Sequence, residues 1–153
     1  MIRTIVGFSA LMTALAGCAA TPPPAAPSMH HGPAAAGKPV VTPIVRTATT
    51  ISGQPLRLPQ GAAEMVAASV DIPAGGRVML HRHPWSRFVY VESGRIAVRN
   101  RDTGTTTEAA AGQALAEVVN QWHEADALDG APARLVVIDV VPPGVVNVEM
   151  PPK

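Results

Sequence analysis

Residues 75–94 read GGRVMLHRHPWSRFVYVESG, and the architecture of the whole chain can be inferred outward from this segment. It contains two short runs rich in hydrophobic residues, 77–82 and 87–92, which are separated by Pro84. Such runs, bounded by turn residues, are typical of β-strands. Ser93-Gly94 leads directly into a third run, 95–100, and Gly94 supplies the positive φ that a tight turn needs. The segment therefore predicts a β-hairpin with a further strand before it.

Short apolar runs and turn signals continue on both sides of this segment, and they predict an all-β domain. The best helix formers, residues 108–111, are too few for a stable helix and end at Gly112. Many short strands at regular spacing favour a β-sandwich or a β-barrel. The predicted strands are 64–72, 77–82, 87–92, 95–100, 105–110, 114–119, 121–127 and 133–141.

Three histidines in these predicted strands point to a metal site. His81 and His83 are two residues apart, so on a strand both imidazoles lie on one face and Arg82 lies on the other. Two imidazoles on one face can form half of a metal site. His123 lies far along the chain in another predicted strand, and a barrel can bring the inward faces of these strands together.

Two spaced motifs resemble those of the cupin family. Its first motif is Gly, five residues, His-x-His, three or four residues, Glu, six residues and Gly. Its second motif is Gly, five residues, Pro-x-Gly, two residues, His, three residues and Asn. The corresponding positions here are Gly75, His81, His83, Arg87 and Gly94 for the first motif, and Gly112, Val118, Asn120, His123 and Ala127 for the second. The resemblance implies a double-sheet jelly-roll barrel, in agreement with the strands predicted independently.

The resemblance implies three metal ligands, His81, His83 and His123. It does not name the metal: Fe, Mn, Zn, Ni and Cu all accept imidazole ligands, and availability decides as much as affinity. The alternative is a barrel that keeps these histidines but has lost its metal. Trp85 and Trp122 each flank a histidine motif, and they either pack at the rim or line a ligand pocket that binds substrate.

Arg87 departs most from the family pattern, because it stands where cupins carry a glutamate ligand. An arginine cannot bind a divalent cation. Three-histidine sites occur in cupins that resemble thiol dioxygenases, and there Arg87 would hold a substrate carboxylate. Alternatively, Arg87 faces solvent or pairs with Glu92, Glu117 or Glu124. Glu117 and Glu124 are also candidates to replace the missing carboxylate ligand or to support a histidine.

The first 43 residues predict a lipoprotein leader and a tether. After Arg3, the apolar stretch 5–16 suits a signal peptide and is too short to span a membrane. Residues 15–18, Leu-Ala-Gly-Cys, resemble the lipobox of bacterial lipoproteins, which implies that residues 1–17 are removed and that Cys18 is lipidated, for example with palmitate. Residues 18–43 are rich in Pro and Ala and predict a disordered linker. The cupin-like domain then covers residues 44–153.

Location and partners follow from the leader and from the charge. Residue 19 is Ala rather than Asp, which by resemblance to Gram-negative lipoproteins implies the periplasmic face of the outer membrane. Without the leader the chain has 11 basic and 11 acidic side chains, so no basic surface predicts nucleic-acid binding. The expected partners are the membrane, through the lipid on Cys18, and a small-molecule ligand. A homodimer is a further expectation, because cupins often dimerise.

Three functions remain open on this basis. The first is a lipid-anchored periplasmic protein that binds a divalent metal, alone or with a small molecule. The second is a three-histidine metal-dependent oxygenase or isomerase that acts on a small carboxylate or thiol. The third is a metal-free structural or interaction lipoprotein.

Overall fold

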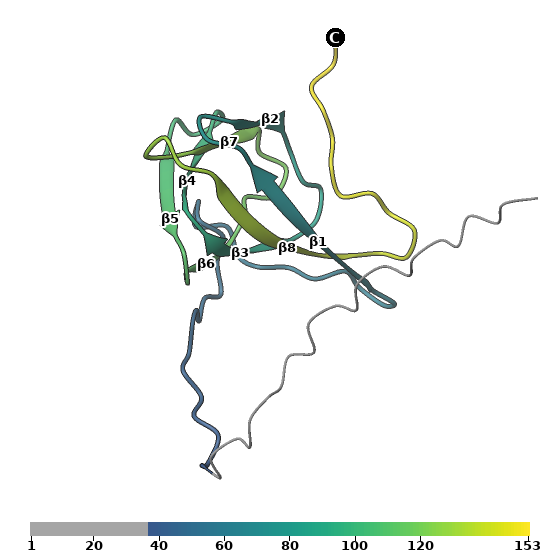
Figure 1. Ribbon diagram of the computed structural model, residues 1–153. Helices are drawn as coiled ribbons and strands as arrows, with labels where there is room; N and C mark the ends of the chain where they lie inside the picture. Colours follow the sequence, from purple (N-terminus) through teal and green to yellow (C-terminus); the bar gives the residue numbers. More distant parts are fainter. Residues whose placement is uncertain (1–36) are drawn as a thin grey trace, which may run out of the picture. The chain divides into compact units, whose positions relative to one another are not determined.

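Eight β-strands make up the regular structure of residues 37–153, the part of the chain that this computed structural model describes (Figure 1). Within that part, no helix is long and apolar enough to cross a membrane. The predicted leader and Cys18 lie outside the described residues. The strands are β1 (Glu64–Ile72), β2 (Arg77–His81), β3 (Arg87–Ser93), β4 (Arg95–Asn100), β5 (Thr106–Ala110), β6 (Ala114–Ala116), β7 (His123–Ala127) and β8 (Ala133–Val141).

The strands form two four-stranded antiparallel sheets, in the orders β1-β8-β3-β6 and β2-β7-β4-β5 (Figure 1). Among the described strands, consecutive ones lie in different sheets except β4 and β5, which pair directly, and this crossing connectivity is that of a jelly roll rather than of a simple meander. The predicted all-β jelly-roll fold is therefore confirmed. The predicted hairpin of residues 87–92 and 95–100 is wrong, because β3 and β4 belong to different sheets and the turn at Gly94 carries the chain from one sheet to the other. The predicted bounds of β1, β4 and β8 agree with the structure, and those of β2, β3 and β5 differ by one residue.

The hydrophobic core lies between the two sheets and is built from alternate positions of facing strands. Val89 and Val91 of β3 meet Ile96 and Val98 of β4, and Leu135 of β8 joins them. Successive side chains of a strand point to opposite faces, so residues two apart are buried together. Each such side chain contributes about 1.5–3 kcal/mol through burial, which makes this cluster the main source of stability.

Two strands are shorter than predicted where the chain passes the histidines. β6 ends at Ala116 instead of residue 119, and β7 begins at His123 instead of residue 121. Between them Asn120 has a φ of 55°, and its N–H donates to the carbonyl oxygen of His83 at 2.8 Å. A strand cannot continue through this left-handed conformation, which asparagine tolerates better than most residues. Asn120 stands where the cupin motif has glycine, another residue that adopts this conformation readily.

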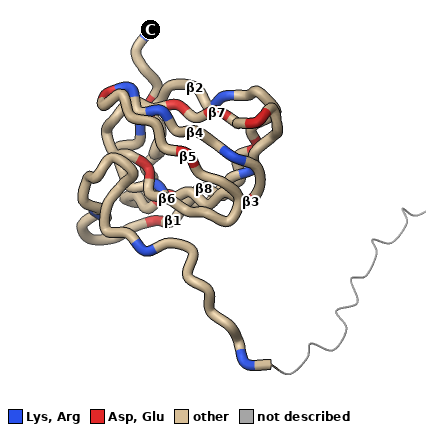
Figure 2. The backbone as a smooth tube through the Cα atoms, turned by 90° about the vertical axis from the view of Figure 1, so that its left-hand side faces the viewer, with Lys and Arg blue, Asp and Glu red and all other residues tan. Residues whose placement is uncertain are grey.

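The carboxylates of β7 are paired with arginines of the neighbouring strands. Asp126 accepts from Arg77 of β2 at 2.5 Å, and Glu124 accepts from Arg101, which follows β4, at 2.6 Å. Figure 2 shows basic and acidic positions interspersed over the described chain rather than gathered by sign. The arginines are partly exposed, so these pairs contribute little to stability. Both oxygens of Glu124 are paired with arginines, and among the described residues no hydrogen bond or ion pair to a histidine supports the alternative that Glu124 replaces the missing ligand or supports a histidine.

Candidate metal centre

The pairing of β2 with β7 brings two of the three histidines together. His81 and His123 are Cα partners in this antiparallel pair, and directly opposite residues project to the same face of a sheet. His83 lies two residues beyond His81, past the end of β2, and its ring turns into the same space. All three side chains are buried: His81 is 5% exposed, and His83 and His123 are 0% exposed.

A backbone carbonyl orients each imidazole ring. Nδ1 of His81 lies 2.6 Å from the carbonyl oxygen of Met79. Nδ1 of His83 lies 2.5 Å from the carbonyl oxygen of Asn147, and Nδ1 of His123 lies 2.9 Å from that of Gln121. A carbonyl oxygen can only accept, so each Nδ1 carries a proton and donates it. In a neutral ring the Nε2 atom then presents a lone pair. This is the tautomer in which a histidine binds metal through Nε2 while its other nitrogen is held by an outer partner.

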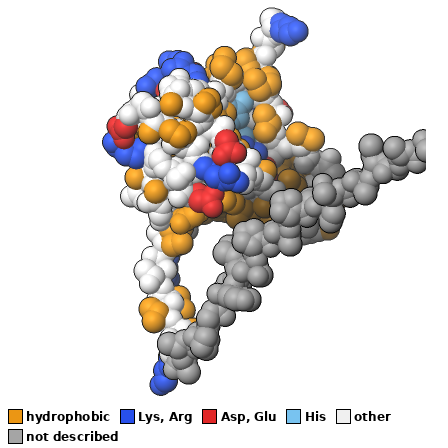
Figure 3. Space-filling view, in the orientation of Figure 1, with side chains coloured by type: hydrophobic (Ala, Val, Ile, Leu, Met, Phe, Trp, Pro, Cys, Tyr) orange, Lys and Arg blue, Asp and Glu red, His pale blue; other side chains and the backbone are white. Residues whose placement is uncertain are grey.

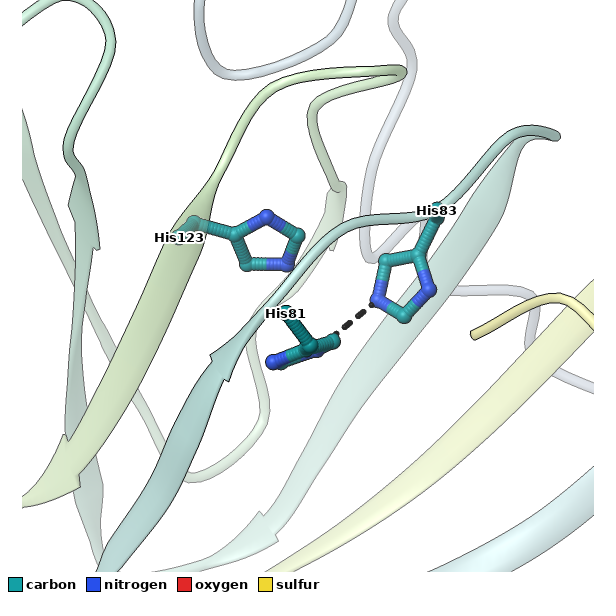
Figure 4. Close-up of side chains that lie close together, drawn as sticks. All are labelled: His81, His83 and His123. Carbon is teal, nitrogen blue, oxygen red and sulfur yellow. Dashed lines mark hydrogen bonds between the residues drawn. The ribbon is translucent and has the colours of Figure 1, made fainter. Parts of the chain in front are cut away.

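The three rings surround a common space (Figure 4). Nε2 of His81 lies 3.1 Å from Nε2 of His83, and one ligand nitrogen from each histidine lies within 4.8 Å of the others. Two ligand atoms bound to one ion at about 2.1 Å lie roughly 3.0–3.4 Å apart as neighbours and about 4.2 Å apart when opposite. The three nitrogens are therefore close to the spacing that a single ion requires.

The three Nε2 atoms are better satisfied with a cation between them than without one. Without a proton or a cation between them, the facing Nε2 lone pairs of His81 and His83 repel each other. Nε2 of His123 is buried and has no hydrogen-bond partner among the described residues. A buried polar atom left in this state costs about 1–3 kcal/mol. A divalent ion would satisfy all three nitrogens at once.

Glu117 adds a carboxylate to the cluster. Its Oε2 atom lies 3.1 Å from Nε2 of His83 and 3.8 Å from Nε2 of His123. The residue is 7% exposed, and it lies one position beyond the end of β6. The alternative that Glu117 supports or supplements the histidines is therefore compatible with the structure.

Burial and Glu117 together set the protonation of the cluster. Burial lowers the pKa of His81 to about 4, which keeps its ring neutral and able to bind metal. Burial also opposes the charged form of His123, but the Glu117 carboxylate outweighs it and raises the pKa of His123. Burial disfavours the charged form of Glu117 as well, yet His123 and His83 hold the pKa of its carboxyl well below the usual range. Glu117 is thus an ionised carboxylate among imidazoles.

Arg87 lies beside this cluster, but its partner was not anticipated. Its Nε donates to Oδ1 of Asp139 at 2.8 Å, and a terminal nitrogen donates to Oδ2 at 2.6 Å. Both side chains are largely buried, at 14% and 9% exposure. The expectation that Arg87 faces solvent or pairs with Glu92, Glu117 or Glu124 is wrong. The planar guanidinium is held in a forked pair from the next strand instead.

Asp139 and Asn147 are the two residues of this site that the sequence analysis missed. Asn147 donates to Asp139 at 2.7 Å. Burial acts to raise the pKa of the Asp139 carboxyl, but the hydrogen bonds from Arg87 and Asn147 hold that pKa below its ordinary value. Asp139 carried a signal, since it is the one acidic residue within the apolar run 135–141. Asn147 carried none, because it lies in an irregular segment that only the tertiary structure brings against His83.

A small internal cavity of about 30 Å³ adjoins the cluster. It is lined by His81, Arg87 and Glu117 together with apolar side chains of the core. This volume holds a water molecule or two, not a substrate. A small histidine surface is visible among hydrophobic side chains in Figure 3.

Neither tryptophan lines this cavity. Trp122 packs against Arg82, whose guanidinium carbon lies 4.8 Å from the ring centroid. Trp85 borders two hollows on the outer surface, one shared with Arg57 and Asn120. The expected substrate contacts of Trp85 and Trp122 at the histidines therefore gain no support from their positions.

Comparison with protein families gives a match that covers these residues. Residues 68–139, which include all three histidines, match a family model described as cupin domain. No curated protein sequence matches the chain.

Solved structures similar to this chain come from several bacteria. A protein from Bacillus halodurans is 23% identical over 54% of this chain and 67% of its own, with a TM-score of 0.47. An RmlC-like cupin from Shewanella frigidimarina is 20% identical over 53% and 69%, with a TM-score of 0.45. A protein with a double-stranded β-helix domain from Klebsiella pneumoniae is 21% identical over 64% and 91%, with a TM-score of 0.48. Residues 68–139 are thus similar to cupin domains in sequence, and the described residues have the two-sheet β fold.

Proposed function

We propose that this chain is a lipid-anchored periplasmic protein whose cupin domain binds a divalent metal ion through His81, His83 and His123. One observation carries the proposal: three buried imidazoles direct Nε2 atoms at a common space while backbone carbonyls hold each Nδ1. Rings tied in this way lose little further freedom on binding metal. The set suits Fe, Mn, Zn, Ni or Cu, all of which accept imidazole nitrogen.

The lipid anchor is supported by the sequence around Cys18. A lipobox, a short apolar stretch before it and a Pro- and Ala-rich segment after it occur together. This part of the proposal is tested by fractionating cells and following incorporation of labelled palmitate into the parent and into Cys18→Ser. Label in the parent alone, with the protein in the outer-membrane fraction, is the expected result. A labelled Cys18→Ser variant, or an unlabelled parent, contradicts it.

The metal site is tested by the metal content of the full-length chain, purified without a histidine tag from the fraction that contains it. We expect about one equivalent of metal in the parent, because a single cluster of three nitrogens serves one ion. The double variant His81→Ala/His83→Ala should contain none and should keep the β-sheet circular dichroism spectrum. Metal-free parent protein that cannot be loaded with any of the five metals would refute the site.

A three-histidine oxygenase or isomerase is a second candidate, favoured by one observation: Arg87 lines the same cavity as His81 and Glu117. A substrate carboxylate could reach Arg87 only if the forked pair with Asp139 opened and the cavity grew. Binding requires no such rearrangement, so we rank it first. Metal-dependent oxygen uptake with small carboxylates or thiols by the loaded protein would reverse this order.

A further inference from the structure

We infer that Glu117 supplies a fourth ligand to the proposed metal ion, in place of the carboxylate that the cupin motif would carry at position 87. The inference rests on the proposed function, since it concerns the same three-histidine site. It adds a carboxylate to the three histidines that the resemblance implied, and this carboxylate lies one position beyond β6 rather than in β3.

The register of the sheet explains how a carboxylate at position 117 can lie in the same site as the side chain at position 87. Phe88 of β3 is the Cα partner of Ala116 of β6, and the N–H of Glu117 donates to the carbonyl oxygen of Arg87 at 2.9 Å. Glu117 is therefore the next residue across from Arg87 in the same antiparallel pairing. Residues directly opposite each other project to the same face. Both side chains accordingly line the internal cavity beside His81.

The ion pair between Arg87 and Asp139 explains why Glu117 is not paired with Arg87 and can bind a metal ion. Asp139 of β8 is the Cα partner of Arg87 on its other side, and it takes both arms of the guanidinium. The three charged side chains thus lie in a row across three adjacent strands, Asp139, Arg87 and Glu117. Arg87 is neutralised by Asp139, and among the described residues no lysine or arginine forms an ion pair with Glu117.

The surroundings of Glu117 contain imidazoles instead of a fixed cation. Its Oε2 lies 3.1 Å from Nε2 of His83 and 3.8 Å from Nε2 of His123, within the spacing of ligand atoms on one ion. An ionised carboxylate in a buried site is costly unless positive charge faces it. A metal ion held by the three imidazoles would supply that charge, and three nitrogens with one carboxylate oxygen form an ordinary set for zinc, iron or manganese.

The experiment compares the full-length parent with Glu117→Gln, which has the same size but a neutral amide. Each protein is stripped, loaded with Co²⁺ as a probe, and titrated with a competing chelator while the visible absorption spectrum is recorded. Loss of an outer partner of a metal ligand costs about 10–100-fold in affinity. Loss of a ligand atom should therefore raise Kd by about 100-fold or more, and the Co²⁺ bands should change in position and intensity.

Glu124→Gln is the matched control, because Glu124 is also buried but its oxygens pair with Arg101 and Arg77. It should keep the parent's affinity and spectrum. Glu117→Asp is the second variant if Glu117→Gln does not fold. This variant keeps the carboxylate charge, but its side chain is one methylene shorter. If Glu117 is a ligand, the Co²⁺ spectrum of Glu117→Asp should therefore differ from that of the parent.

The outcomes separate the two proposals. If the parent binds Co²⁺ and Glu117→Gln matches it in affinity and spectrum, Glu117 is not a ligand although the metal site stands. A weaker Glu117→Gln with an unchanged spectrum also overturns the inference, because the carboxylate then acts only through its charge. A Glu117→Asp spectrum identical to that of the parent would have the same meaning. A parent that binds no metal refutes the proposed function and the inference together.

Discussion

Residue 87 decides the character of this site more than any other single position. A glutamate there would have been a ligand, whereas Arg87 brings a positive charge into the barrel and must be neutralised. Asp139 performs that role from the adjacent strand, and Asn147 holds Asp139 in turn. The positive charge that replaces the glutamate of the cupin motif is therefore neutralised within the barrel, by the buried ion pair of Arg87 with Asp139.

Replacing Asp139 by Asn should leave Arg87 buried without a counter-ion. We expect the free energy of unfolding at pH 7 to fall by roughly 3 kcal/mol, as urea denaturation would measure. The pKa of Asp139 is lower in the folded protein than its ordinary value of 3.8. Its contribution is therefore fully present above that value and is lost as the pH falls towards the folded-state pKa. The difference between parent and variant should accordingly shrink below about pH 4.

Asp129→Asn provides the control for this measurement. Asp129 pairs with Arg95, and both side chains are about half exposed. Its left-handed φ of 59° is one that asparagine tolerates. The expected change in the free energy of unfolding is small, because exposed ion pairs contribute little to stability. Equal losses in the two variants would show that the Arg87–Asp139 pair has no special weight.

At the scale of elements, the turn that leads from β3 in one sheet to β4 in the other depends on a glycine with two separate requirements. Gly94 has a φ of 77°, and a Cβ atom there would lie 2.4 Å from the carbonyl oxygen of Pro132 and 2.8 Å from Cα of Ala133. Gly104 has a φ of 71° but open space around the corresponding position. Both glycines therefore need a positive φ, but only Gly94 also has backbone atoms where a Cβ atom would lie.

The pair of substitutions Gly94→Ala and Gly104→Ala separates these requirements. Gly104→Ala should cost about 1 kcal/mol, the strain of a left-handed alanine. Gly94→Ala should cost roughly 1–3 kcal/mol more, because the backbone at Pro132 must move. Urea denaturation of both variants measures the difference. Equal costs would mean that the contact with the start of β8 is easily relieved.

At the scale of the whole molecule, the C-terminal segment closes over the histidine cluster. Arg82 and Glu149 form a backbone bridge with two hydrogen bonds of 3.0 Å, and their side chains pair at 2.6 Å. Between this bridge and β8, Asn147 accepts from His83 and bonds to the backbone of Trp85. The site is thus formed by residues of β2 and β7, by residues just beyond the ends of β2 and β6, and by the C-terminal segment.

Deletion of residues 144–153 should weaken metal binding although it removes no proposed ligand. His83 would lose the carbonyl that fixes its tautomer, so we expect Kd to rise by about 10–100-fold. Chelator competition measures it, with circular dichroism to verify folding. Val146→Ser is a suitable control, since its side chain is 80% exposed and it should bind metal as the parent does. Unchanged affinity after the deletion would show that the segment does not orient His83.

Metal binding should also raise the thermal stability of the whole domain. A ligand at 100 times its Kd adds about 2.7 kcal/mol to the stability of the folded state. Calorimetry of the parent with and without metal should therefore show a higher Tm with metal. The double variant His81→Ala/His83→Ala should show no shift, and a shift in that variant would place the bound metal elsewhere.

The local features of this protein could be predicted from its amino-acid sequence. Short apolar runs and turn residues are sufficient to place the eight strands, because strand formation follows side-chain alternation and turn chemistry that neighbouring residues encode. The spacing of His81 and His83 likewise places both rings on one face. All of the metal ligands proposed here could be named as candidates from the sequence.

Only the tertiary structure decided which distant groups meet. The partner of Arg87 could not be predicted, because it depends on which strands are adjacent and in what register, and β8 lies beside β3 only in the folded barrel. The same register places Glu117 opposite Arg87, and the return of the C-terminal segment brings Asn147 to His83. The physical reason is that a one-residue shift in pairing moves every side chain to the other face, and the packed core as a whole selects the register.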